Sequence, residues 1–149
     1  MELIIIRGRQ NDGKTTTATL VHNELVGRCT KVRMVRTNGG YLSVGKNVVD
    51  FQSVIDLGKK RVVIISEGDD DDRLFELMQD LIDDYRPDFV VVCARAYDRV
   101  GSSYRMLTER FANLIIPENE IRIEYSEDPA KMGEVKQKAV ETIVSRIIK

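Results

Sequence analysis

The stretch IIIRGRQNDGKTTTATL, residues 4–20, places a polar loop between an apolar segment and a helical one. Residues 3–6 have the composition of a buried strand, and residues 14–26 carry a helical pattern. Gly8 and Gly13 bound the loop, and a lysine and three threonines follow the second glycine. Glycine lets the backbone turn tightly enough for successive N–H groups to point at one anion. The stretch therefore predicts a strand, an anion-binding loop and a helix, in that order.

The loop fits G-x-x-x-x-G-K-[ST], the phosphate-binding P-loop or Walker A motif, from Gly8 to Thr15. In this motif the helix N-terminus faces the phosphates, the lysine spans the β- and γ-phosphates, and the hydroxyl coordinates Mg²⁺. We therefore predict a catalytic role for Lys14 and a metal-binding role for Thr15. The predicted nucleotide-binding residues are Gly8, Arg9, Gln10, Asn11, Asp12, Gly13, Lys14, Thr15 and Thr16.

The segment NDGKTTTATL resembles the Asn-Ser-Gly-Lys-Thr-Thr loop of the molybdopterin-guanine dinucleotide biosynthesis adaptor proteins. It is also similar to the Gly-Lys-Thr-Thr-Thr run of signal-recognition-particle GTPases and of partition-type ATPases. All belong to the SIMIBI class of P-loop NTPases, which also contains dethiobiotin synthetase. The resemblance is confined to the loop and the start of its helix. It implies a P-loop nucleotide-binding fold, and it leaves open a homodimer formed across the nucleotide.

Strand-like and helical segments alternate along the chain, which favours an α/β fold. Strands are expected at 2–7, 30–36, 61–66, 88–94 and 120–125, and helices at 14–26, 70–85, 102–112 and 131–148, with a short helix at 48–57. The first, third and fourth strands are continuously apolar, as in strands buried on both faces, while the other two alternate. We therefore expect a three-layer P-loop NTPase fold over residues 1–149, a single domain. Its sheet should have five mainly parallel strands in the order 2-3-1-4-5, with helices on both faces.

A P-loop needs an acidic partner at the end of a neighbouring strand. The apolar residues 62–65 run into Ser66-Glu67-Gly68-Asp69. This resembles the strand followed by Glu-Gly in dethiobiotin synthetase and the molybdopterin adaptors, although the usual Walker B pattern has an aspartate at the strand's end. We predict Glu67 as a catalytic and metal-binding residue, and Asp69 as a further Mg²⁺ ligand.

Three arginines, Arg95, Arg99 and Arg105, follow the fourth predicted strand. Small P-loop kinases, such as shikimate or nucleotide kinases, carry an arginine-bearing lid in this region. Arginine there can bind a second phosphate or stabilise the transferring one, and surface arginines at a solvated helix start are the alternative. The guanine-reading pattern Asn-Lys-x-Asp is absent from the sequence, which favours ATP over GTP.

Composition and charge limit the partners. The net charge of −1 argues against broad binding to nucleic acid. No apolar run approaches the ~20 residues that span a bilayer, so no membrane partner is expected. The two cysteines lie far apart and the chain has one histidine, His22, which we expect at the surface. Free thiols of this kind are typical of a reducing cytoplasm.

The sequence thus favours a cytoplasmic protein that binds Mg²⁺ and ATP. Three function classes remain open: a hydrolytic or ligase-like ATPase, a small-molecule or nucleotide kinase, and a non-enzymatic adaptor whose loops respond to the γ-phosphate. The second partner, a small molecule or a protein, is not named by the sequence.

Overall fold

The computed structural model describes residues 1–9, 13–28, 31–34, 50–66, 71–95 and 100–149, with the side chains of residues 32–34 and 71 left aside. The main elements, in chain order, are β1 (Glu2–Gly8), α1 (Lys14–Val26), β2 (Lys31–Met34), β3 (Gln52–Leu57), β4 (Lys60–Ile65), α2 (Asp71–Tyr85), β5 (Phe89–Arg95), α3 (Ser103–Arg110), β6 (Glu120–Arg122) and α4 (Pro129–Ile148).

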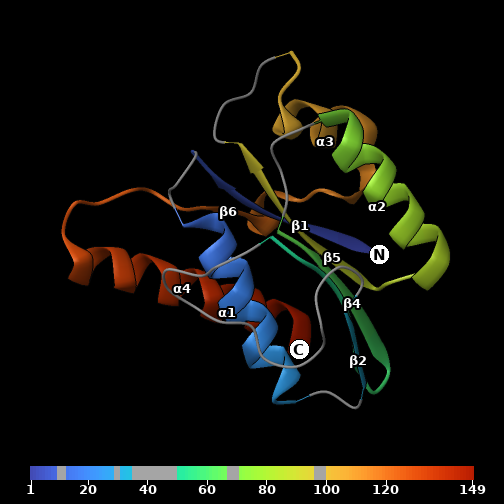
Figure 1. Ribbon diagram of the computed structural model, residues 1–149, viewed down its shortest axis with the longest axis horizontal. Helices are drawn as coiled ribbons and strands as arrows, with labels where there is room; N and C mark the ends of the chain where they lie inside the picture. Colours follow the sequence, from blue (N-terminus) through green and yellow to red (C-terminus); the bar gives the residue numbers. More distant parts are fainter. Residues whose placement is uncertain (10–12, 29–30, 35–49, 67–70, 96–99) are drawn as a thin grey trace.

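The elements form three layers, and the predicted α/β class with helices on both faces is confirmed. Helices α1 and α4 lie on one side of the sheet and α2 and α3 on the other (Figure 1). The alternation of side chains along the strands explains this arrangement, since Ile4 and Ile6 of β1 pack with α1 and α4, whereas Leu3 and Ile5 pack with α2 and α3. Each face of the central strands is therefore covered by its own apolar core.

The predicted strand order and the mainly parallel sheet are wrong. The described residues form a mixed sheet in the order β2-β3-β4-β5-β1-β6. Strands β4, β5, β1 and β6 pair in parallel, whereas β3 is antiparallel to both β2 and β4. Three strands with continuous apolar runs were correctly expected near the centre, but buried composition does not determine which of them are neighbours. As a result β5, and not β4, lies beside the loop-bearing strand β1.

The prediction of a short helix at 48–57 is wrong, because residues 52–57 form strand β3. Strand β3 joins β4 through Gly58 and Lys59, with Leu57 paired to Lys60. Gly58 has a φ of 75°, which a two-residue hairpin turn favours and which glycine adopts without strain. The prediction failed because buried polar residues interrupt the apolar pattern of the strand.

The antiparallel hairpin brings the start of β3 to the edge of the sheet where β1, β4 and β5 end. The carboxyl ends of β1, β4 and β5 meet at one edge of the sheet, which is where open α/β sheets bind ligands. Because β3 runs the other way, its first residue, Gln52, pairs with Ile65 at the end of β4. The start of β3 therefore lies at the same edge as the loop after β1.

Among the described residues, none of the helices has the length and apolar character to cross a membrane.

Candidate functional site

The loop between β1 and α1 is closed by its own lysine. Strand β1 ends at Gly8, and α1 begins at Lys14 after Gly13, whose φ of 96° lies in the left-handed region. The Lys14 ammonium donates a hydrogen bond to the carbonyl oxygen of Gly8 at 2.8 Å, and the residue is only 9 % exposed. The conformation of Gly13 lets the chain enter the helix without a side chain at the turn. An ammonium group is thus held against the backbone of the loop, at the N-terminal end of α1.

The hydroxyl groups at the start of α1 differ in their partners. Thr17 donates to the carbonyl oxygen of Gly13 at 2.9 Å, and Thr19 donates to that of Thr15 at 2.8 Å. The Thr15 hydroxyl instead leaves its helix and donates to a carboxylate oxygen of Asp50 at 3.2 Å. Thr15 is half-buried and Asp50 is exposed, so this pair lies at the surface of the edge where the strands end.

Asp50 is a site residue that sequence reasoning missed. It precedes β3, and the Ser66 hydroxyl at the end of β4 lies 3.3 Å from the same Asp50 oxygen that binds Thr15. Ser66 also accepts the backbone N–H of Phe51 at 2.8 Å, which fixes the chain next to Asp50. The acidic partner of the loop in the described residues therefore comes from the start of an antiparallel strand. The segment 48–57 was predicted as helical, so no carboxylate at this edge was expected from it.

Several predicted residues lie outside the described part of the chain: Gln10, Asn11, Asp12, Glu67, Asp69 and Arg99. Their roles stay predictions. Glu67 was predicted because β4, the strand before it, was expected to be the direct neighbour of β1. In the structure β5 lies between β4 and β1.

Strand β5 brings one predicted arginine close to the loop. Arg95 is the register partner of Gly8 in the parallel pair of β1 and β5, and its backbone N–H donates to the Ser103 hydroxyl at 3.1 Å. Arg105 lies in the first turn of α3 and forms an ion pair with Glu109 at 3.6 Å. Arg95 is therefore placed beside Gly8, at the start of the loop after β1, whereas Arg105 belongs to the helix on the opposite face from α1.

The expectation that His22 lies at the surface is wrong. Its side chain is 0 % exposed, and its Nδ1 atom lies 2.9 Å from the Ser53 hydroxyl of β3. Its ring meets that of Phe51 edge-on, with the centroids 5.3 Å apart. Beneath the loop, the Cys93 thiol of β5 donates to the carbonyl oxygen of Lys14 at 3.6 Å. These contacts join α1 to β3 and β5.

The donor set at this edge suits Mg²⁺ better than a transition metal. In the described ranges, no three His, Cys, Asp or Glu side chains gather as a metal site. The Thr15 hydroxyl and the Asp50 carboxylate supply two hard oxygen donors side by side. Mg²⁺ is normally held by one or two carboxylates together with phosphate oxygens and waters, so a full protein cage is not required. Thr15 and Asp50 therefore supply two oxygen donors of the kind that Mg²⁺ prefers, without forming a complete protein site.

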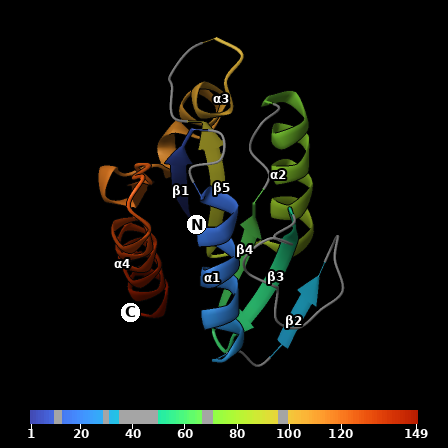
Figure 2. The ribbon, with the colours of Figure 1, turned by 60° about the vertical axis from the view of Figure 1, so that its left-hand side comes forward.

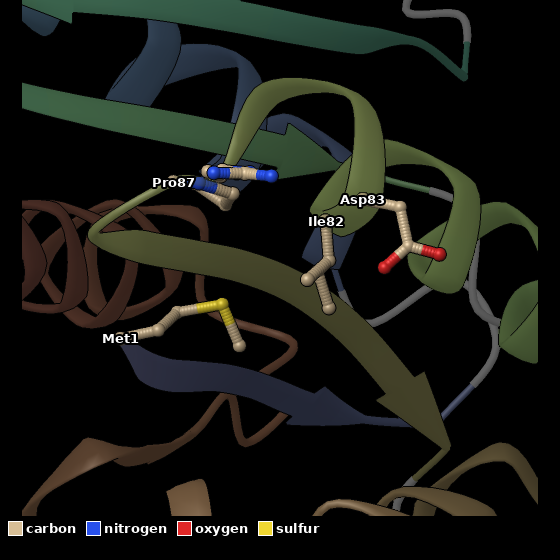
Figure 3. Close-up of a pocket in the computed structure, with 5 residues that line it drawn as sticks. Met1, Ile82, Asp83 and Pro87 are labelled. Carbon is tan, nitrogen blue, oxygen red and sulfur yellow. The ribbon is translucent and has the colours of Figure 1, made fainter.

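Two open hollows lie away from this edge. One, of about 510 Å³, is lined by Met1, Ile82, Asp83, Arg86 and Pro87, near the amino ends of β1 and β5. Figure 3 shows Met1 and Ile82 extending toward each other across the start of β5, with the Asp83 carboxylate turned aside. The other, of about 410 Å³, follows α1 and is lined by Leu20, Asn23, Glu24, Gly27 and Arg28. Neither includes a residue of the phosphate loop.

Comparisons with protein-family models, curated proteins and solved structures found no match. The function is therefore inferred from the geometry of the loop and of Asp50.

Proposed function

We propose that the chain binds Mg-ATP at the loop of residues 8–15 and hydrolyses it, as a cytoplasmic P-loop NTPase. The observation that carries this proposal is the hydrogen bond from Thr15 to Asp50, 35 positions further along the chain. A hydroxyl at the first turn of a helix, joined to a carboxylate at the end of the sheet, is the pair that P-loop proteins use for Mg²⁺. An arbitrary glycine turn before a helix requires no such partner.

The position of Lys14 supports the same proposal. Its ammonium group is nine-tenths buried and lies on the carbonyl oxygen of Gly8, on the other side of the loop. When phosphate enters, charge-assisted hydrogen bonds from Lys14 to phosphate oxygens are stronger than its bond to a neutral carbonyl. The helix N-terminus after Gly13 adds N–H groups that have no acceptor within the helix, and a partial positive charge. Lys14 and the loop backbone thus bind and orient the triphosphate.

The metal would be held by Thr15 and Asp50. By accepting the Thr15 O–H, Asp50 leaves the lone pairs of the hydroxyl oxygen directed away from itself and available to a cation. Mg²⁺ bound there supplies neutralisation of the charge that develops on the phosphate oxygens. Ser66 keeps Asp50 in place through the hydroxyl contact at 3.3 Å.

Phosphate transfer to a second substrate is an alternative supported by one observation. Arg95 lies directly beside Gly8 in the sheet. Its side chain therefore begins on β5, next to the strand that precedes the loop. Arginine at that place can bind a second phosphorylated group or stabilise the one in transfer. In this alternative the loop binds the same nucleotide, and only the acceptor differs.

The nucleotide proposal is tested by calorimetric titration of Mg-ATP into the wild type and Lys14→Ala. We expect the substitution to weaken binding at least tenfold, about 1.4 kcal/mol or more. The matched control is Lys138→Ala, which removes an exposed lysine of α4. Circular dichroism melts show whether each variant is folded. Equal affinities of a folded Lys14→Ala and the wild type would refute the site.

Product analysis separates the function classes. Release of phosphate from ATP by the chain alone, lost in Lys14→Ala, supports the NTPase. A phosphorylated product that appears only with a metabolite panel, and only while Arg95 is present, identifies a kinase. Tight binding without either product assigns the chain to nucleotide-gated adaptors and refutes the enzymatic proposal.

A further inference from the structure

A second lysine reaches the loop from the C-terminal helix. A Cβ atom placed on Gly13 would lie 2.5 Å from Cε of Lys136, 3.2 Å from its Nζ and 3.6 Å from its Cδ. The end of the Lys136 side chain thus lies directly against the backbone of Gly13, at the last turn before α1. A side chain at position 13 would displace the end of Lys136, and the φ of 96° at Gly13 itself favours glycine.

The position of Lys136 is set by the packing of α4. Helix α4 lies beside α1 on one face of the sheet (Figures 1 and 2), and the two share an apolar core. The N-terminus of α4 is capped by Asp128, which accepts the N–H of Ala130 at 3.0 Å. Near the other end, Arg146 forms an ion pair with Glu2 of β1 at 2.8 Å. The buried Met132 and Ala139, on either side of Lys136 in the sequence, pack in the core shared with α1, and this packing places Lys136 near Gly13.

The surroundings of Lys136 favour an anion. In the described part of the chain, its ammonium group has no hydrogen bond or ion pair, and the first turn of α1 carries no acidic residue. Lys14 and the helix N-terminus add positive charge at the same turn. Two ammonium groups near one turn raise the local positive potential, which attracts an anion.

We propose that Lys136 is a second phosphate-binding lysine, which contacts the nucleotide from α4 while Lys14 contacts it from the loop. This inference rests on the proposed nucleotide site and adds a residue that the motif does not contain. It also makes α4 part of the site. A flexible lysine stem allows the short movement from Gly13 to a bound phosphate.

The test is calorimetric titration of Mg-ATP into the wild type, Lys136→Gln and Lys138→Gln at low and high salt. Lys136→Gln leaves a polar side chain, one bond shorter than lysine, but removes the charge. Charge-assisted hydrogen bonds to phosphate, discounted for partial exposure, predict an affinity about five- to tenfold lower for Lys136→Gln at low salt. The difference from the wild type should shrink at high salt. Lys138→Gln removes an exposed charge two residues away and should bind as the wild type does.

The outcomes separate this inference from the proposed function. If the wild type binds and Lys14→Ala does not, but Lys136→Gln binds like Lys138→Gln, the site stands and the role of Lys136 is refuted. Tighter binding by Lys136→Gln would also refute it, since the lysine would then occupy the place of the phosphate. If the wild type does not bind Mg-ATP at all, the proposed function falls and this inference falls with it. Melting temperatures equal to that of the wild type exclude misfolding as the cause of a loss.

Discussion

Replacing Asp50 by asparagine tests the proposed metal-binding carboxylate, which the sequence did not predict. The substitution keeps an oxygen near Thr15 and Ser66 but removes the negative charge. Asp50 is exposed, so the free energy of unfolding should change by less than about 1 kcal/mol. Binding of Mg²⁺ should change far more, because a dication interacts with a full charge. Asp50→Asn should therefore change the Mg²⁺ dependence of ATP binding while the free energy of unfolding stays nearly the same.

The magnitude follows from Coulomb's law. Two unit charges about 4 Å apart, a separation typical of a carboxylate that holds Mg²⁺ through a water, interact by about 1 kcal/mol in bulk water. A dication doubles this to about 2 kcal/mol, which corresponds to about a thirtyfold loss of affinity for Mg-ATP. For ATP in EDTA the sign reverses: without the metal, the carboxylate repels the phosphates, so Asp50→Asn should bind metal-free ATP as tightly as the wild type or more tightly.

The assay is calorimetric titration of ATP with Mg²⁺ and with EDTA, on wild type, Asp50→Asn, Glu67→Gln and Asp80→Asn. Asp80 is an exposed aspartate of α2 and serves as the matched control. If Asp50→Asn loses affinity equally with and without the metal, the carboxylate acts on the loop and not on Mg²⁺. If Glu67→Gln alone abolishes the response to Mg²⁺, the residue predicted from the strand pattern is the ligand and the reasoning on Asp50 is refuted.

Two further predictions concern the buried contact between His22 and Ser53 and the base of the nucleotide. Ser53→Ala removes the hydroxyl partner of the buried His22 and should lower the free energy of unfolding by about 1–2 kcal/mol in denaturant titrations, with Mg-ATP affinity unchanged; a loss below about 0.3 kcal/mol would show that the contact is not stabilising. ATP should bind more tightly than GTP, because the chain lacks the guanine-reading motif; displacement of ATP by GTP at equal or lower concentration would contradict this.

The strand and the helix that flank the loop are well predicted because their signal is local. A buried strand, two glycines, a lysine and a helix follow one another within residues 2–26, and the order of those elements is the order in the fold. The helices α2 and α4 are also well predicted, because apolar side chains recur at helical spacing over many residues. Local pattern is sufficient where neighbours in sequence are neighbours in space.

The sheet order is not a local property. Strands β1, β4 and β5 are all continuously apolar and all buried on both faces, so any of them can lie next to any other by composition alone. The observed order consists of pairings such as that of Ile5 in β1 with Val92 in β5. These are contacts between residues far apart in the chain.

Strand β3 could not be recognised for a related reason. Its first two residues, Gln52 and Ser53, are polar yet buried, at 7 % and 0 % exposure. Ser53 is accommodated there because it meets His22, a residue 31 positions away whose burial was itself unexpected. A polar residue predicts exposure only if no partner is available in the core. Two such residues in contact therefore mislead a pattern-based prediction together.

The missed strand and the missed carboxylate have the same cause, and this links the fold to the proposed chemistry. In a parallel sheet, only the carboxyl end of a strand can present an acidic residue to the loop after β1. Strand β3 is antiparallel to β4, so the residues before it reach that edge from the opposite direction. Asp50 takes this position and meets Thr15, while Lys136 of α4 meets Gly13 at the same turn. The proposed site thus combines a carboxylate for the metal with a second ammonium for the phosphates.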